Sequence, residues 1–184
     1  MPQNANAQQA RTVTTADRGK LDLKALTLYA ILLAAGFVLN MTVSKFFSGL
    51  TGGFLSPEFI IAAFCLEILI IKPNIGQAAV IGLLAGVVIQ ITASVKGPDL
   101  IAEPVAAAVM ALLVSAFADS RAKGLLPLVG TFISGIIYAV IFSFLIMKNP
   151  AFVGVMAPVV AATGVANAII VAALHLPIKK ALKL

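Results

Sequence analysis

Charged residues are scarce in this sequence. Only 11% of its residues are Asp, Glu, Lys or Arg, whereas 61% are hydrophobic and the mean hydropathy is +1.08. A soluble domain usually carries roughly 25% charged residues, so the composition excludes one. No charge falls within residues 25–44, 73–95 or 124–147. Because about 20 helical residues cross the ~30 Å hydrocarbon core of a bilayer, these stretches predict membrane-spanning helices.

Cysteine and histidine are almost absent, and this excludes several kinds of chemistry. The single cysteine, Cys65, cannot form an intrachain disulfide, and its apolar neighbours predict a small core side chain. The single histidine, His175, cannot build a metal site. The sequence has no His-Glu-x-x-His motif and no glycine-rich phosphate loop with its lysine. We therefore expect no catalytic residues, no metal and no cofactor, and a protein that is not an enzyme.

The spacing of the remaining charges predicts an all-α integral membrane protein, a compact bundle of six transmembrane helices. The predicted spans are residues 25–44, 56–71, 75–93, 100–118, 125–147 and 152–174. They form a membrane domain over residues 24–176, between a disordered polar tail (1–23) and a basic tail (177–184). Ser56 is expected to cap the second span, and Lys72-Pro73-Asn74 to break the chain before the third.

Basic residues predict the orientation of the bundle. With the amino terminus inside, ten of them lie in inner loops and tails, and three, Lys45, Lys96 and Lys148, lie in outer loops. This asymmetry follows the positive-inside rule and predicts that both termini are cytoplasmic. It also accounts for the net charge of +6 without a nucleic-acid partner. We expect a multi-pass protein of a bacterial cell membrane, with the lipid bilayer as its surroundings.

Glu67 is the one acidic residue that clearly lies within a predicted span, about one turn from its inner end, rather than near a span start. Ionisable groups there are costly, so the position has two interpretations: pairing with a nearby lysine such as Lys72, or coupling to a partner protein. Proton-driven carriers usually embed several such groups and often contain two related halves. The sequence shows neither feature, so it has no visible means of powering transport.

The predicted outer face combines aromatic rings, a glycine-rich connector and charges of both signs. Such a combination suits an outward-facing pocket for a small zwitterion or a planar ring. The alternative is a pair of ordinary loops with an interfacial aromatic belt and acids at helix starts. The candidate substrate-binding residues are Phe46, Phe47 and Phe54 around the connector, Lys96, Asp99 and Glu103 in the next outer loop, and Gln90 and Tyr138 from below.

Two pairs of small residues lie one helical turn apart. They are Ala30-x-x-x-Ala34 in the first span and Gly82-x-x-x-Gly86 in the third. Such pairs let two helices approach closely, either inside the bundle or at a docking surface.

Taken together, the six short spans, Ala30-x-x-x-Ala34 and the Gly/Phe loop after it resemble a substrate-binding S-component of an energy-coupling factor (ECF) transporter. The resemblance covers residues 24–176. Within that family, the run from Ser56-Pro57-Glu58 to Lys72-Pro73 and the Gly-Pro-x-Leu-Ile loop look most like the tryptophan-transport group.

This resemblance implies a subunit that captures a small-molecule nutrient, tryptophan or a vitamin, from outside. It implies docking of Ala30 and Ala34 on a transmembrane coupling subunit that carries two ATPase subunits. It also implies that residues 45–55 act as a gate over the substrate. Two other classes stay open, a self-sufficient secondary transporter and a membrane assembly subunit that binds no ligand.

Overall fold

The computed structural model describes residues 22–117 and 124–182, and every regular element in this part of the chain is a helix. Helices α1 (Leu23–Leu39) and α2 (Lys45–Leu50) are joined by a π-helical turn, Asn40–Ser44, into one continuous rod of 28 residues. The others are α3 (Phe59–Ile71), α4 (Ile75–Thr92), α5 (Asp99–Ala116), α6 (Leu126–Ile141), which continues as a π-helical turn (Phe142–Ile146), and α7 (Phe152–Ala181).

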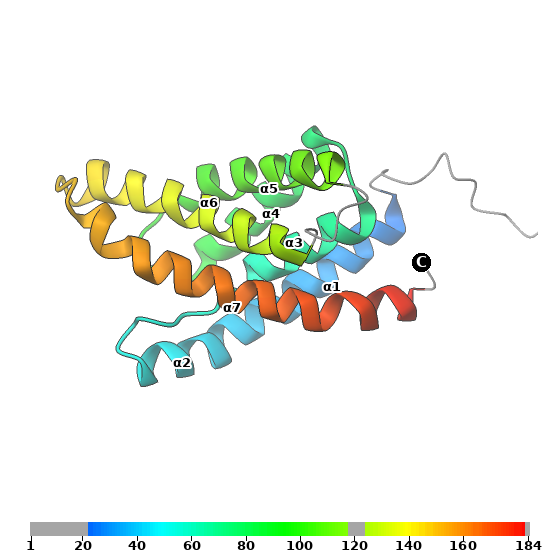
Figure 1. Cartoon of the computed structure of the whole chain (residues 1–184), viewed down its shortest axis with the longest axis horizontal. Helices are drawn as coiled ribbons and strands as arrows, with labels where there is room; N and C mark the ends of the chain where they lie inside the picture. Colours follow the sequence, from blue (N-terminus) through cyan, green and yellow to red (C-terminus); the bar gives the residue numbers. More distant parts are fainter. Residues whose placement is uncertain (1–21, 118–123, 183–184) are drawn as a thin grey trace, which may run out of the picture.

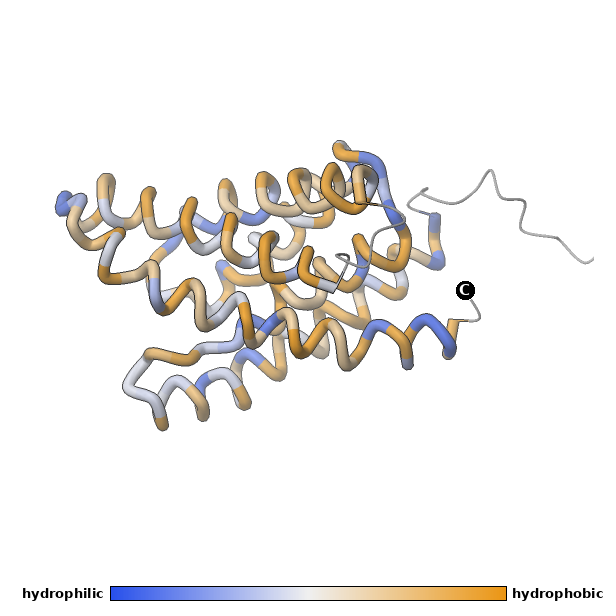
Figure 2. The backbone as a smooth tube through the Cα atoms, in the orientation of Figure 1, coloured by the Kyte–Doolittle hydropathy of each residue, from blue (hydrophilic) through white to orange (hydrophobic). Residues whose placement is uncertain are grey.

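These helices form one elongated bundle. The start of α1 and the end of α7 lie at the same end of it (Figure 1). Hydrophobic residues cover most of the length of the helices, and hydrophilic ones gather towards the ends of the bundle (Figure 2). The predicted helical bundle is therefore confirmed as an architecture. Which side of a membrane the termini face stays a prediction.

Within residues 22–117 and 124–182, five helices are long and apolar enough to cross a membrane, against the six spans predicted. The second predicted span corresponds to α3, which has only 13 residues. At 1.5 Å per residue it is about 20 Å long, shorter than a hydrocarbon core. The protein is thus a multi-pass helical membrane protein whose α3 lies within a bundle of longer helices.

Several of the predicted helix boundaries are wrong. The first helix does not stop at Ser44 but continues to Leu50, because the π-helical turn accommodates an extra residue without ending the helix. Ser56 does not cap α3, which begins three residues later at Phe59. The last helix runs on to Ala181, so most of the predicted tail 177–184 is helical. Residues 1–21 of the predicted tail 1–23 lie outside the described residues, whereas Asp22 caps α1 and Leu23 begins it.

The core of the bundle is built around α3. Nine consecutive residues of this helix are buried, from Ile60 to Ile68, so it is enclosed on all sides. Cys65 is among them and is fully buried, which confirms the prediction of a core side chain. Glu67 is also fully buried, and neither of its carboxylate oxygens has a hydrogen-bond partner among the described residues. Of the two interpretations of Glu67, pairing with Lys72 is therefore wrong, and Lys72 lies exposed in the turn after α3.

The Gly82/Gly86 pair packs inside the protein rather than forming a docking surface. A Cβ at Gly86 would lie 2.7 Å from the carbonyl oxygen of Asp99, and one at Gly82 would lie 2.7 Å from the Cβ of Ala107 and overlap the carbonyl oxygen of Glu103. Helices α4 and α5 therefore approach until backbone meets backbone. This contact sets the positions of the two acidic residues at the start of α5.

We expect Gly82→Ala to force α4 and α5 apart and to lower the free energy of unfolding by about 1–3 kcal/mol, the usual cost of overpacking. Thermal unfolding of the purified protein in detergent measures this effect. The matched control is Gly154→Ala in α7, where an added Cβ meets no atom within 4 Å. Equal stability of the two variants would contradict the close approach of α4 and α5.

Candidate functional site

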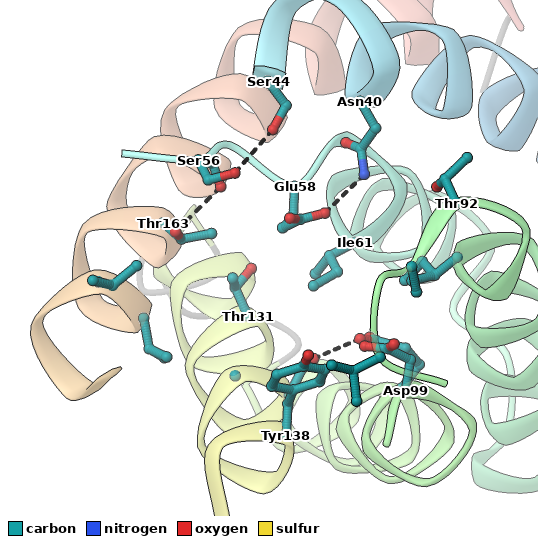
Figure 3. A pocket seen from close by; sticks show the side chains of 18 of the residues that line it. Asn40, Ser44, Ser56, Glu58, Ile61, Thr92, Asp99, Thr131, Tyr138 and Thr163 are labelled. Carbon is teal, nitrogen blue, oxygen red and sulfur yellow. Dashed lines mark hydrogen bonds between the residues drawn. The ribbon is translucent and has the colours of Figure 1, made fainter. Parts of the chain in front are cut away.

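A cavity of about 360 Å³ lies between the helices, at the level where α3 begins. Its wall is built by the π-helical turn Asn40–Ser44 and the start of α2, by α3 and the segment before it, by α4 and the loop after it, and by α5, α6 and α7. Figure 3 shows side chains from these elements pointing into the space between Glu58, Asp99 and Tyr138. The lining residues are Asn40, Met41, Ser44, Lys45, Ser56, Glu58, Ile61, Ile89, Thr92, Ala93, Ser94, Val95, Asp99, Glu103, Thr131, Ser134, Gly135, Tyr138, Met156, Val159, Val160 and Thr163.

The π-helical turn in the first helix supplies polar groups to one wall of the cavity. Asn40 and Ser44 both lie in this turn and both line the cavity. Ser44 Oγ lies 3.1 Å from Ser56 Oγ, and Thr163 Oγ1 of α7 donates to the carbonyl oxygen of Ser56 at 3.2 Å. Turns of this kind occur frequently at functional sites, since they shift the side chains that follow. Here the turn links α1 to α7 through the segment before α3.

Two asparagines from neighbouring helices bind the start of α3. Asn40 Oδ1 accepts from the backbone N–H of Phe59 at 2.6 Å, and its Nδ2 donates to Glu58 Oε2 at 2.7 Å. Asn167 of α7 accepts from the N–H of Glu58 at 3.0 Å and donates to the Glu58 carbonyl at 3.1 Å and to Thr131 Oγ1 at 3.2 Å. The first amide groups of a helix have no partner within it, so these bonds satisfy groups that would otherwise be buried unpaired.

Acidic residues form the opposite wall. Asp99 and Glu103 are one turn apart on the same face of α5, and both are buried. Gln90 Nε2 donates to Asp99 Oδ2 at 3.2 Å, and Ser134 Oγ of α6 donates to Glu103 Oε1 at 2.7 Å. With Glu58, the cavity has three carboxyl groups, whereas Lys45 is the basic residue of its lining. Lys45 is exposed, so the acids lie deeper than the base.

Aliphatic and aromatic side chains complete the wall. Ile61, Ile89 and Val160 contribute from three different helices. The ring of Tyr138 stacks on Phe142 with centroids 5.9 Å apart and planes inclined by 15°, and Phe142 in turn packs against Phe152. A cavity with polar groups at defined points and apolar surface between them is typical of small-molecule sites.

Three of the predicted substrate-binding residues line this cavity: Asp99, Glu103 and Tyr138. Gln90 lies behind Asp99 and binds it, and its Oε1 also accepts from the N–H of Gly97 at 2.8 Å. Lys96 donates to the backbone carbonyl of Gln90 and does not line the cavity. These two residues therefore shape the loop before α5.

The predicted aromatic contacts lie elsewhere. Phe46 and Phe47 are on α2 rather than in a loop, and pack edge to face with centroids 5.8 Å apart. These two rings and Phe54 are exposed, by 62%, 38% and 54% respectively, and none lines the cavity. Their contact with a ligand stays a prediction that requires residues 45–55 to move over the cavity.

Sequence reasoning missed the two asparagines. Asn40 and Asn167 each stand in a long apolar stretch, where an amide must find partners inside the protein. An amide side chain in an apolar stretch is therefore a usable signal in the sequence. It was overlooked because the spans were found from the spacing of charged residues, and asparagine carries no charge. Glu58, which immediately precedes α3, also has its side chain facing the cavity.

The residues of the predicted docking face, Ala30 and Ala34, are exposed on α1. Ile31 and Val38 on the same helix are also exposed, by 62% and 57%. This face of α1 is therefore exposed, as contact with either lipid or a partner helix would require, whereas Tyr29 and Leu33 on its other face are buried.

Comparison with known proteins gives one match. A protein of Bacillus subtilis (strain 168), named a probable tryptophan transport protein, is 26% identical over 152 residues, which cover 79% of this chain and 85% of that protein. No family model and no solved structure matches. The similarity loosely supports the resemblance to the tryptophan-transport group and points to a membrane transporter.

We expect Asn167→Ala to lower the free energy of unfolding by about 1–3 kcal/mol, because the buried N–H and carbonyl of Glu58 lose their partner. Thermal unfolding in detergent measures the change. Asn149→Ala is the matched control, since Asn149 is exposed in the turn before α7 and its Oδ1 accepts a long, solvent-exposed bond from the N–H of Ala151 at 3.2 Å, so its loss should cost less than about 1 kcal/mol. A similar loss in both variants would mean that α3 does not depend on this amide.

Proposed function

We propose that the protein is the substrate-capture subunit of an ECF-type importer, which binds tryptophan, or failing that a vitamin of similar size, from outside. The observation that carries this proposal is the cavity, with its buried acids and apolar walls, in a chain similar to a protein named a probable tryptophan transport protein.

The dimensions and lining of the cavity favour a compact ligand. Its volume of about 360 Å³ is near the lower end of the ~300–1,000 Å³ typical of ligand pockets. An amino acid with a planar side chain fits this range better than a large vitamin such as cobalamin. Acids on α5 and Lys45 at the exposed side match the two charges of a zwitterion, and Ile61, Ile89 and Val160 match an apolar ring.

Docking on a coupling subunit would supply the energy that this chain has no evident means of supplying. The exposed Ala30 and Ala34 support this part of the proposal, because small residues let a partner helix approach closely. The proposed partners are a transmembrane coupling subunit and two ATPase subunits, which would hydrolyse the ATP.

A second candidate function is a self-sufficient secondary transporter, and Glu67 is the observation that favours it. A fully buried carboxyl group without hydrogen-bond partners is the kind of group that binds and releases protons in carriers. Against it stands the position of Glu67 in the buried, apolar helix α3, where neither of its oxygens is hydrogen-bonded to a second titratable group among the described residues.

The identity of the substrate is tested by fluorescence. The sequence contains no tryptophan, so indole fluorescence reports the ligand alone. We expect the emission of added tryptophan to shift to shorter wavelength and saturate as the indole enters the cavity. Ile89→Phe, which fills the cavity wall, should weaken binding by about tenfold or more, roughly the 1.4 kcal/mol of a lost ring contact. Ile91→Phe on the same helix is the control, because Ile91 is 68% exposed.

No saturable change with tryptophan, together with no heat of binding, would contradict the tryptophan assignment. Equal weakening by Ile89→Phe and Ile91→Phe would instead place the ligand outside the cavity. Thermal unfolding of both variants shows whether they fold.

Docking is tested with Ala34→Phe. A bulky ring on this face should separate the partner helix and abolish ATP-dependent uptake, while tryptophan binding by the isolated chain stays within a few-fold of the original. Ala161→Phe, at an exposed position on α7, is the matched control. Uptake by the chain alone in ATP-free liposomes, unaffected by Ala34→Phe, would favour the secondary transporter.

A further inference from the structure

The carboxyl group of Glu103 has an unused acceptor in the cavity wall. Its Oε1 accepts from Ser134 Oγ at 2.7 Å, but its Oε2 is buried and has no hydrogen-bond partner among the described residues. The side chain is only 1% exposed. A buried acceptor without a donor is costly, so this atom indicates a donor that arrives with the ligand.

This atom lies in a cavity lined by three carboxyl groups, and no basic side chain among the described residues is hydrogen-bonded to them. The hydrogen-bond donors that reach Glu58, Asp99 and Glu103 are the neutral side chains of Asn40, Gln90 and Ser134. Lys45, the basic residue of the lining, is exposed, whereas the acids of α5 are buried. Several carboxyl groups around one enclosed space are tolerated best when a positive charge can enter between them.

We propose that Glu103 and Asp99 form a subsite for a positively charged nitrogen, so that the natural ligand carries an ammonium or an equivalent cationic group. This inference rests on the proposed function as a nutrient-binding subunit, but not on tryptophan as the nutrient. The two residues share one face of α5, and the close contact of α4 with α5 at Gly82 and Gly86 fixes that face. An ammonium group there donates to Glu103 Oε2 in a charge-assisted hydrogen bond.

The cation is organic rather than a metal ion. Within residues 22–117 and 124–182, no group of three His, Cys, Asp or Glu side chains is placed to hold a metal. An ammonium needs only acceptors on one side, because the rest of its molecule occupies the remaining space. In a zwitterion the carboxylate would then point away from α5, towards Lys45.

The test compares three indole compounds that differ only in charge: tryptophan, tryptamine without the carboxylate, and indole-3-propionate without the ammonium. Glu103→Gln keeps the shape of the side chain and an acceptor for Ser134, but removes the negative charge. We expect this variant to weaken tryptophan and tryptamine by about tenfold or more, and to leave the already weak binding of indole-3-propionate unchanged. Glu67→Gln is the matched control, since Glu67 is equally buried but lies outside the cavity, and it should leave all three affinities unchanged.

Unchanged binding of tryptophan and tryptamine by Glu103→Gln would overturn the subsite while leaving the capture function intact. If no indole compound binds the unsubstituted protein, the same comparison is made with thiamine, which is cationic, and riboflavin and biotin, which carry no cationic nitrogen. Binding of thiamine that depends on Glu103 would support the subsite and reject tryptophan. Binding of riboflavin or biotin alone, or of no cationic compound, would overturn it.

Discussion

The start of α3 inside the bundle is the constraint on which the rest of the structure depends. A hydrocarbon core offers no water to the free amide groups at a helix start, so the protein must supply partners. Asn40 and Asn167 do this from α1 and α7, and they tie those two helices to the segment that precedes α3. Because the short helix α3 begins part of the way along the bundle, the longer helices enclose a space beyond its first residues, and this space is the cavity.

The sequence predicts the helical bundle well because charge is nearly excluded from membrane-spanning segments. Lys72 and Asn74 mark the break between α3 and α4, and there the boundaries agree within a residue. The prediction fails where the signal is not charge. Nothing in the sequence distinguishes a π-helical turn at residues 40–44 from the end of a helix, so Phe46 and Phe47 were placed in a loop although they are helical.

The residues of the candidate site were likewise predicted only in part. Asp99, Glu103 and Tyr138 were found because charge and hydroxyl groups are conspicuous near apolar spans, and all three line the cavity. The exposed phenylalanines were included because aromatic rings suit a planar ligand, but the sequence carries no information on which side of a helix faces inward at a protein–lipid boundary. Asn40 and Asn167 were missed, although the hydrogen bonds of an amide in an apolar span must end inside the protein.

Glu103 and Glu67 show that burial alone does not define a functional carboxyl group. Both are almost fully buried, and both have oxygens that no described residue hydrogen-bonds. Glu103, however, lies in the wall of a cavity beside Asp99 and is oriented by Ser134, whereas Glu67 is surrounded by the packed core. Only the first can meet a ligand without opening the bundle. The same carboxyl chemistry therefore supports substrate recognition at Glu103, and at Glu67 it would require the core itself to rearrange.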